Sequence, residues 1–226
     1  AFIFEPLVLG AAGMIMYSPQ ILDELIALCK SHNVFTIADE VMTGFGKTGK
    51  TFACDYLSLQ PDMMCLSKAL TGGTIPMAIT TFTQEIFDGF YDDDTSKALF
   101  HGHTFTANPT GCAAALASIS ILQTEAIQKN IQEVNQSHLQ FEQHIKKHPK
   151  VVATRVLGVI FALEIKSDVK ESYYGTMRNT LYNHFIENGV ILRPVGNVVY
   201  ILPPYIISKE QLQKVYQVIE NALEIV

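Results

Sequence analysis

Val34-Phe35-Thr36-Ile37-Ala38-Asp39-Glu40 decides the fold of this chain, because an apolar, strand-forming run ends there on two acids. Residues 2–5 form a similar apolar run, and a helix is predicted between the two. That helix begins at Ser18-Pro19, where serine suits the N-cap and proline suits the first helical position. Strand, helix and strand in this order are the crossover unit of a parallel sheet.

A third apolar run, residues 62–67, ends on Lys68 in the same way that residues 34–38 end on Asp39. In a parallel sheet both side chains emerge at the carboxyl edge, where open α/β sheets bind ligands. A lysine that can form a Schiff base, with an aspartate beside it, is what pyridoxal phosphate chemistry requires.

Taken singly, Asp39 is best interpreted as a turn cap and Lys68 as a surface lysine at a helix start. The pair favours a shared ligand, for two reasons. A lysine at a helix N-terminus is disfavoured by the helix dipole. An acid that closes a buried strand is costly to desolvate unless a partner is supplied.

Composition and charge argue against several classes of protein. A chain of 226 residues allows one large domain or two small ones, and 48% hydrophobic with 17% charged residues is ordinary for a globular protein. The net charge of −6 argues against nucleic-acid binding, and no apolar run is long enough to span a bilayer. The cysteines form no C-x-x-C pair and are predicted to be buried free thiols in a reducing compartment, the cytoplasm: Cys29, Cys54, Cys65 and Cys112.

The start of the chain is itself predicted to be a buried strand, and such a strand needs neighbours on both faces. We therefore expect the sequence to be a piece of a longer protein, cut inside or just before a sheet strand. We expect the large domain to occupy residues 1–124 and a compact α+β domain to occupy residues 125–226.

The second domain is predicted from a long helix that begins after Thr124 and from the segments that follow it. Two strands are expected over residues 151–165 and a helix over residues 176–187. Residues 190–193 and 198–202 are predicted to form a hairpin that turns at Gly196-Asn197. Ser208 and Gln211 have the spacing of a capping box at the start of the last helix.

Two polar segments could suggest other chemistry. Residues 43–51 (TGFGKTGKT) are rich in glycine, but the glycines lack the spacing of a phosphate-binding P-loop, so a loop that shapes a site or an interface is favoured. His101-Gly102-His103 is a weak metal signal without a nearby acid or cysteine. Thr104 could bind phosphate before the helix that opens at Pro109, or could simply cap that helix together with an asparagine.

Arg193 lies in an apolar run that is predicted to be a strand. An arginine there needs an anion, and its planar fork suits a carboxylate. An internal salt bridge is the alternative. Tyr200 lies nearby and could belong to the core or line a pocket.

Four stretches together give the chain a recognisable pattern: Glu5-Pro6 with its glycine-rich tail, ADEVMTGFGKTGK (38–50), PDMMCLSKALTGG (61–73) and HGHTFTANPTGCAAALASI (101–119). The chain resembles class III (ornithine-type) pyridoxal-phosphate-dependent aminotransferases over essentially its whole length. The resemblance implies a fold-type I α/β protein, here a partial large domain with a mainly parallel sheet, followed by the small α+β domain.

The resemblance also implies roles for individual residues. Lys68 would be the Schiff-base lysine and the acid/base of the proton shift, and Asp39 would keep the pyridine nitrogen protonated. Val41 would pack on the ring face. His103 and Thr104 would bind the cofactor phosphate of the neighbouring subunit in a homodimer. In the substrate pocket, the implied residues are Gly102, Tyr200 and Arg193, with Arg193 holding the carboxylate of the keto acceptor.

Within the family, CLSKALTGGTIP, FHGHTFTANP and residues 189–207 look most like the branch that acts in biotin synthesis. That branch implies amino transfer from S-adenosylmethionine to 8-amino-7-oxononanoate, with lysine as the alternative donor. Met42 stands where many members have glutamine, which argues against the ornithine and 4-aminobutyrate branches. The family's N-terminal half, with its other phosphate-binding loop, has no counterpart here. Another class III enzyme, such as a mutase or decarboxylase, and an inactive structural fragment are the alternatives.

Overall fold

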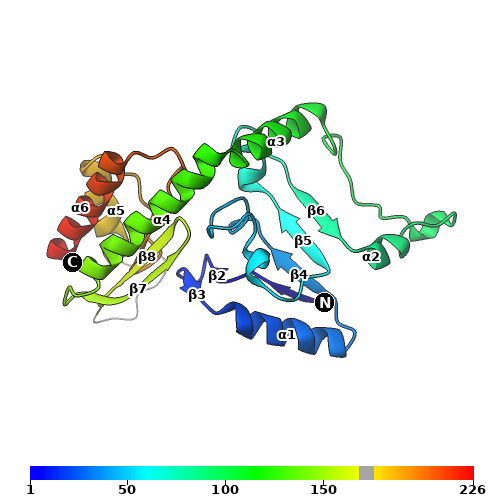
Figure 1. Ribbon diagram of the computed structural model, residues 1–226, viewed down its shortest axis with the longest axis horizontal. Helices are drawn as coiled ribbons and strands as arrows, with labels where there is room; N and C mark the ends of the chain where they lie inside the picture. The colour runs from blue at the N-terminus through cyan, green and yellow to red at the C-terminus, as the bar shows by residue number, and fades with distance from the viewer. Residues whose placement is uncertain (168–175) are drawn as a thin grey trace. The chain divides into compact units, whose positions relative to one another are not determined.

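The computed structural model describes residues 1–167 and 176–226, shown in Figure 1. The described chain forms two compact units. The first comprises Ala1–Leu7, Tyr17–Phe45 and Thr51–Gln123, and the second comprises Val8–Met16, Gly46–Lys50 and Thr124–Val226. The chain thus passes finally into the second unit at Thr124, but two earlier segments also belong to that unit. A single division of the sequence at residues 124 and 125 does not describe them.

The first unit is built on a four-stranded sheet with the order β1-β4-β5-β6. Strands β1 (Phe2–Phe4), β4 (Thr36–Asp39) and β5 (Met63–Leu66) are parallel, and β6 (Ile79–Phe82) pairs antiparallel with β5. The expected mainly parallel α/β sheet is therefore confirmed, and the strands are shorter than the apolar runs that predicted them.

Helix α1 (Pro19–Ser31) is the crossover between β1 and β4, as predicted. The Ser18 hydroxyl accepts the backbone N–H of Ile21 at the N-terminus, and Leu22 and Ile26 are the buried residues of the helix. Asn33 follows the helix in the left-handed conformation, with φ of 53°. That conformation ends the helix and turns the chain towards β4.

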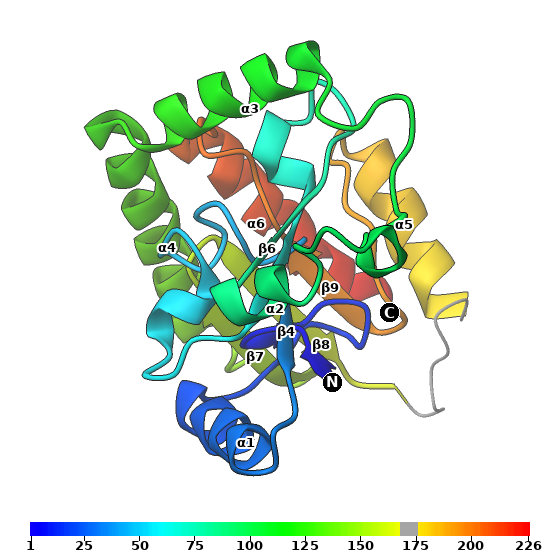
Figure 2. The ribbon, with the colours of Figure 1, turned by 90° about the vertical axis from the view of Figure 1, so that its right-hand side faces the viewer.

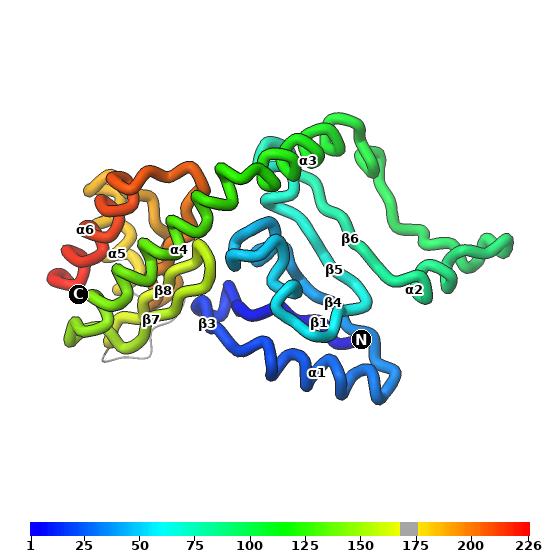
Figure 3. Tube along the Cα trace, in the orientation of Figure 1, coloured from blue at the N-terminus to red at the C-terminus, as the bar shows by residue number. Residues whose placement is uncertain are grey.

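The remaining elements of the first unit are short except for one helix. They are η1 (Ala53–Tyr56), η2 (Lys68–Thr71), α2 (Gln84–Asp88), η3 (Thr95–Lys97) and α3 (Pro109–Leu122). The tube in Figure 3 follows the chain from β6 through α2 to α3. Helix α3 packs on η2, where the Ser118 hydroxyl donates to the carbonyl of Ala69 at 3.1 Å.

The second unit is an antiparallel sheet with the order β7-β8-β9, packed with helices that can be followed in Figure 2. Strand β8 supplies the centre of the core, with almost every side chain buried. The main elements are β7 (Val151–Leu157), β8 (Ile160–Ile165), β9 (Val198–Ile201), α4 (Glu125–Ile145), α5 (Thr176–Glu187) and α6 (Lys209–Ile225). A two-stranded ribbon of β2 (Val8–Leu9) and β3 (Ile15–Met16) also belongs to it. The predicted capping box of Ser208 and Gln211 is confirmed.

The predicted hairpin of residues 190–193 and 198–202 is confirmed at its turn and its second strand, and wrong for its first strand. Val195 and Val198 exchange two backbone hydrogen bonds around Gly196-Asn197, and β9 begins at Val198. Residues 190–193 form no strand, and β9 pairs with β8, leaving a single bridge between Val195 and Val198 near the expected turn. Pro194 gives the reason, because proline has no N–H for a ladder and restricts the residue before it. Arg193 is therefore an exposed residue of an irregular segment rather than a strand residue.

The cysteines are free thiols, as predicted, but only Cys54 is fully buried and the other three are partly exposed. Among the described residues, no single helix is long and apolar enough to cross a membrane. Helices α3 and α4 meet that length and composition test only when taken together as a bent pair.

A histidine lies in the core of the second unit. His138 of α4 is completely buried; its Nε2 lies 3.1 Å from the carbonyl of Val159, and its Nδ1 lies 2.8 Å from the Tyr216 hydroxyl. A carbonyl can only accept, so Nε2 carries the proton and Nδ1 accepts from Tyr216. Burial lowers the pKa of His138 to about 4.

This histidine should make stability fall in mild acid. Above pH 6.5 it is neutral in both states, whereas between about pH 6.5 and 4 the unfolded chain binds a proton that the folded chain excludes. The loss over this range should be on the order of 3 kcal/mol. Urea unfolding at several pH values checks it. His138→Gln should flatten the pH dependence, whereas substitution of the exposed His32 should leave it unchanged; identical profiles for wild type and His138→Gln would refute the assignment.

Candidate active site

Asp39 and Lys68 lie at the same edge of the first unit's sheet, as the sequence predicted. Asp39 is the last residue of β4 and pairs in register with Cys65 of β5. Strand β5 ends at Leu66, and η2 begins at Lys68. Since β4 and β5 are parallel neighbours, the acid and the amine follow the carboxyl ends of adjacent strands.

Lys68 occupies an unusual backbone conformation. Its φ is 46°, in the left-handed region that a non-glycine residue rarely adopts. Hydroxyl groups hold the backbone on both sides: Ser67 donates to the carbonyl of Met77 at 2.8 Å, and Ser118 donates to the carbonyl of Ala69. Lys68 is exposed, and its side-chain ammonium has neither a hydrogen bond nor an ion pair with any described residue. Backbone strain of this kind is concentrated at functional sites, and the strained residue here carries an amine that is free to react.

Asp39 is half-buried and supports the turn that follows it. Its Oδ1 accepts the backbone N–H of Val41 at 3.0 Å, and no described residue bonds its other carboxylate oxygen. Val41 is also half-buried. One carboxylate oxygen therefore fixes the side chain, and the second is available to a ligand.

The loop before α3 is exposed and internally hydrogen bonded. The backbone N–H of His103 donates to the Thr106 hydroxyl at 3.0 Å, and the His103 ring Nδ1 accepts the N–H of Phe105 at 3.1 Å. Asn108, not Thr104, caps α3, accepting the N–H of Gly111 at 2.7 Å. The capping alternative is thus confirmed for the asparagine and wrong for Thr104.

Gly102 and Thr104 are both exposed members of this loop. The Thr104 hydroxyl has no partner among the described residues. The loop is therefore able to present hydroxyl and backbone N–H groups to an anion, which is the other interpretation of the sequence.

Arg193 and Tyr200 belong to the second unit, whereas the other candidate residues lie in the first. Tyr200 is half-buried on β9, opposite Ala162 of β8. The exposed Arg193 forms no ion pair with a described residue, so the internal salt bridge that was its alternative interpretation is not formed there.

The glycine-rich loop packs against the sheet of the second unit, a contact that sequence reasoning did not identify. The backbone N–H of Val159 donates to the carbonyl of Lys47 at 3.0 Å. The Lys47 ammonium lies 4.4 Å from the centroid of the Tyr205 ring, and burial lowers the pKa of Lys47. No local pattern links Lys47 to Tyr205, because the pair is far apart in sequence.

The residues at the sheet edge fit pyridoxal phosphate. They combine an unpaired primary amine with a carboxylate oxygen that can face a ring nitrogen, which is the donor set this cofactor needs. Among the described residues, no group of three His, Cys, Asp or Glu side chains is placed to hold a metal ion.

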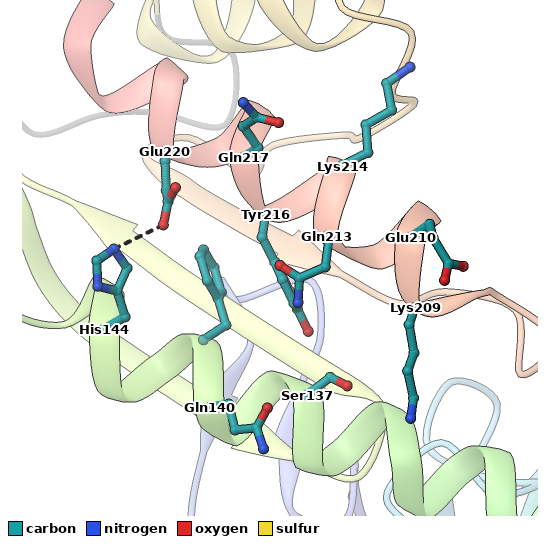
Figure 4. Close-up of a pocket in the computed structure, with 11 residues that line it drawn as sticks. Ser137, Gln140, His144, Lys209, Glu210, Gln213, Lys214, Tyr216, Gln217 and Glu220 are labelled. Atoms are coloured by element: carbon teal, nitrogen blue, oxygen red, sulfur yellow. Dashed lines mark ion pairs between the residues drawn. The ribbon is translucent and has the colours of Figure 1, made fainter.

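A separate hollow of about 860 Å³ lies between α4 and α6 in the second unit (Figure 4). Phe141 and Tyr216 stack on its wall with ring centroids 4.1 Å apart, and His144 and Glu220 pair at 3.1 Å. Its lining is polar and apolar in about equal parts and includes none of the candidate residues.

Comparison with known proteins agrees with the geometry. Residues 1–223 match the family model described as aminotransferase class-III. The chain is 44% identical over 99% of its length to the adenosylmethionine-8-amino-7-oxononanoate aminotransferase of Synechococcus elongatus, of which it covers 52%, and 35% identical over 99% of its length to that of Corynebacterium glutamicum, of which it covers 51%.

Solved structures give the same result. The structure of adenosylmethionine-8-amino-7-oxononanoate aminotransferase from Methanocaldococcus jannaschii matches 99% of this chain and 53% of its own, with a TM-score of 0.92 and 34% identity. A Pseudomonas jessenii omega transaminase in complex with PMP matches 99% of this chain and 50% of its own, with a TM-score of 0.90 and 30% identity. The chain spans about half the length of the curated relatives it matches, and it belongs to the class III aminotransferase family.

Proposed function

We propose that the protein containing this chain is a pyridoxal-phosphate-dependent aminotransferase that moves an amino group from S-adenosylmethionine to 8-amino-7-oxononanoate. The observation behind this proposal is the free Lys68 amine beside Asp39 at the ends of neighbouring parallel strands. The names of the relatives at 34–44% identity support the choice of substrates. Lysine is the alternative amino donor.

The roles of the sheet-edge residues follow from their chemistry. Pyridoxal phosphate, when bound, supplies an electron-withdrawing ring that stabilises negative charge at the substrate carbon. Lys68 would hold the cofactor covalently through Nζ, and the same amine would serve as the general base and acid that moves the proton. One Asp39 oxygen is held by the Val41 N–H, so the other would be able to accept from the ring nitrogen and keep it protonated. Val41 would pack on the ring face.

A second subunit completes the proposed site. His103 and Thr104 would bind the cofactor phosphate of the neighbouring subunit in a homodimer, an arrangement that their exposed loop allows. The segment around them exposes large apolar side chains that a monomer rarely leaves in water. They are Phe87, Phe90, Tyr91, Leu99, Phe100 and Phe105, with exposed fractions from 41% to 86%.

The proposed location of the protein is the cytoplasm.

Arg193 should determine the affinity for the keto acceptor. Arg193→Ala in the full-length protein should raise the KM for 8-amino-7-oxononanoate on the order of 100-fold, because a charge-assisted pair with its carboxylate is lost. The KM for the donor should change little, and Arg193→Lys should be intermediate because it keeps the charge without the fork.

Steady-state kinetics with S-adenosylmethionine or lysine as donor measures both quantities. Equal effects on donor and acceptor would reject the carboxylate role of Arg193. Failure of the wild-type protein to form diaminopelargonate with either donor would reject the proposed function and favour another class III enzyme. The coverage of only half of each relative favours a further alternative, that the 226-residue chain alone is an inactive fragment.

A further inference from the structure

Glu40, the acid beside Asp39, is completely buried in the first unit. Its Oε1 accepts the backbone N–H of Cys54 at 2.7 Å, and its Oε2 accepts the Thr43 hydroxyl at 2.5 Å. The Cys54 thiol also bonds the carboxylate, and burial together with this charge raises the pKa of the thiol. A carboxylate accepts from all of these donors, so Glu40 satisfies its surroundings by hydrogen bonds alone.

No ion pair in the described part of the chain includes Glu40. A buried carboxylate without a cation is costly to desolvate, and its hydrogen bonds are what offsets that cost. Its removal would leave the N–H of Cys54 and the hydroxyl of Thr43 without an acceptor. Removal of the Glu40 carboxylate should therefore disturb the segments that its hydrogen bonds hold together.

The hydrogen bonds of Glu40 also connect to the segment that holds Asp39 and Val41, the two residues proposed to contact the cofactor ring. The backbone N–H of Glu40 donates to the carbonyl of Cys65 at 3.0 Å, which continues the β4–β5 pairing beyond Asp39. The carbonyl of Glu40 accepts the N–H of Gly44 at 2.9 Å and closes the turn of residues 40–44. The same turn contains Val41, whose N–H holds the Asp39 carboxylate.

Close packing leaves this turn little freedom. A Cβ at Gly44 would lie 2.9 Å from the carbonyl oxygen of Glu40 and 3.5 Å from the Phe52 ring. The chain that follows Phe52 is η1, whose Cys54 N–H binds Glu40. The turn is thus held between the end of β4 and η1, with the Glu40 carboxylate as the link.

We propose that Glu40 is a positioning residue: its buried carboxylate fastens the 40–44 turn to η1 and thereby fixes Asp39 and Val41 for the reaction. This inference rests on the proposed function for its catalytic readout. Glu40 directly follows Asp39, the last residue of β4, and its backbone continues the pairing with β5, so the two side chains leave opposite sides of the chain. Glu40 therefore acts through the backbone and does not touch the cofactor or substrate.

The test compares Glu40→Ala, Glu40→Gln and Asp23→Ala in the full-length protein. Glutamine can accept from Cys54 and donate to the Thr43 hydroxyl, so it preserves the network without the charge. Asp23 is the matched control, because its carboxylate also accepts backbone N–H groups of a loop, those of Ser58 and Leu59, but not in the Asp39 turn. Hydrogen–deuterium exchange of residues 39–56 without cofactor and kcat per cofactor-loaded site are measured.

Glu40→Ala should increase exchange in the 40–44 turn by about tenfold and lower kcat by about 30-fold, since a small misplacement of a reacting group is costly. Glu40→Gln should stay within about threefold of wild type in both, and Asp23→Ala should leave kcat unchanged. If Glu40→Ala does not fold, Thr43→Val should show a smaller loss of the same kind, about threefold to tenfold, rescued by Thr43→Ser.

Wild-type kcat in Glu40→Ala, an equal loss in Asp23→Ala, or a Glu40→Gln variant as impaired as Glu40→Ala would each overturn the proposal. In the event that Glu40→Ala does not fold, wild-type kcat in Thr43→Val, or a loss that Thr43→Ser does not rescue, would overturn it. The exchange measurement separates this inference from the proposed function. An inactive wild-type protein would reject the function, whereas the exchange of the 40–44 turn would still report whether Glu40 holds it.

Discussion

Lys68→Arg in the full-length protein should abolish amino transfer, with kcat lowered by roughly 10³-fold or more. Arginine keeps a positive charge at the same place but is always protonated, so it supplies neither a nucleophile nor a base. The effect should be on kcat because Lys68 is the only residue at the sheet edge given a bond-making role. Its free, exposed amine on a left-handed backbone is the structural reason.

Two measurements make this prediction sharp. Borohydride reduction of the wild-type protein in the presence of pyridoxal phosphate, followed by peptide mapping, should place the label on Lys68. Lys129→Arg is the matched control, because Lys129 is an exposed lysine on α4 that, among the described residues, forms a long ion pair with Glu133 at 3.9 Å and lies far in sequence from the sheet edge. A label on another lysine, or an active Lys68→Arg variant, would contradict the assignment of the site.

Gly158→Ala should destabilise the protein by about 3 kcal/mol, which combines left-handed strain with overpacking. Gly158 lies between β7 and β8 with φ of 59°. A Cβ there would lie 2.2 Å from the carbonyl carbon of Thr48, 2.3 Å from the backbone nitrogen of Gly49 and 2.6 Å from the carbonyl oxygen of Lys47. These are backbone atoms, so the glycine-rich loop must move away from the strand turn. The hydrogen bond from Val159 to Lys47 would then break.

Gly189→Ala separates the two contributions. Gly189 also has a positive φ, 72°, but a Cβ there would meet only the Lys214 ammonium at 3.1 Å, the end of a flexible side chain that can move. Its cost should therefore be the backbone strain alone, about 1 kcal/mol. Denaturant unfolding of both variants measures the difference. Equal losses would show that the approach of the loop to Gly158 is not tight.

The predictions that the structure confirmed rest on sequence features that act between residues close together in the chain. Ser18 and Pro19 start α1 because capping and a fixed φ act within one turn of helix. Ser208 and Gln211 start α6 for the same reason. The alternation of apolar runs with a helix was enough to predict parallel strands, and hence to place Asp39 and Lys68 at one sheet edge.

The prediction for residues 190–193 was wrong because an apolar run shows β propensity but not the availability of a partner. Strand β9 pairs with β8, some 40 residues earlier in the chain, and Pro194 withdraws the preceding segment from any ladder. The periodicity of a sequence does not show which of two possible strands will pair with a third. The choice of β8 over residues 190–193 as the partner of β9 was therefore made only in the folded chain.

By itself, the sequence determined the helices, the parallel crossover and the chemical identity of the sheet-edge pair, because these depend on neighbours within a few residues. The tertiary structure alone decided which side chains are buried and which residues distant in sequence are in contact. It placed Glu40 against Cys54, Lys47 against Tyr205, and segment Gly46–Lys50 in the second unit. Such contacts depend on packing between residues distant in sequence, and no local pattern encodes which of the possible partners a side chain will meet.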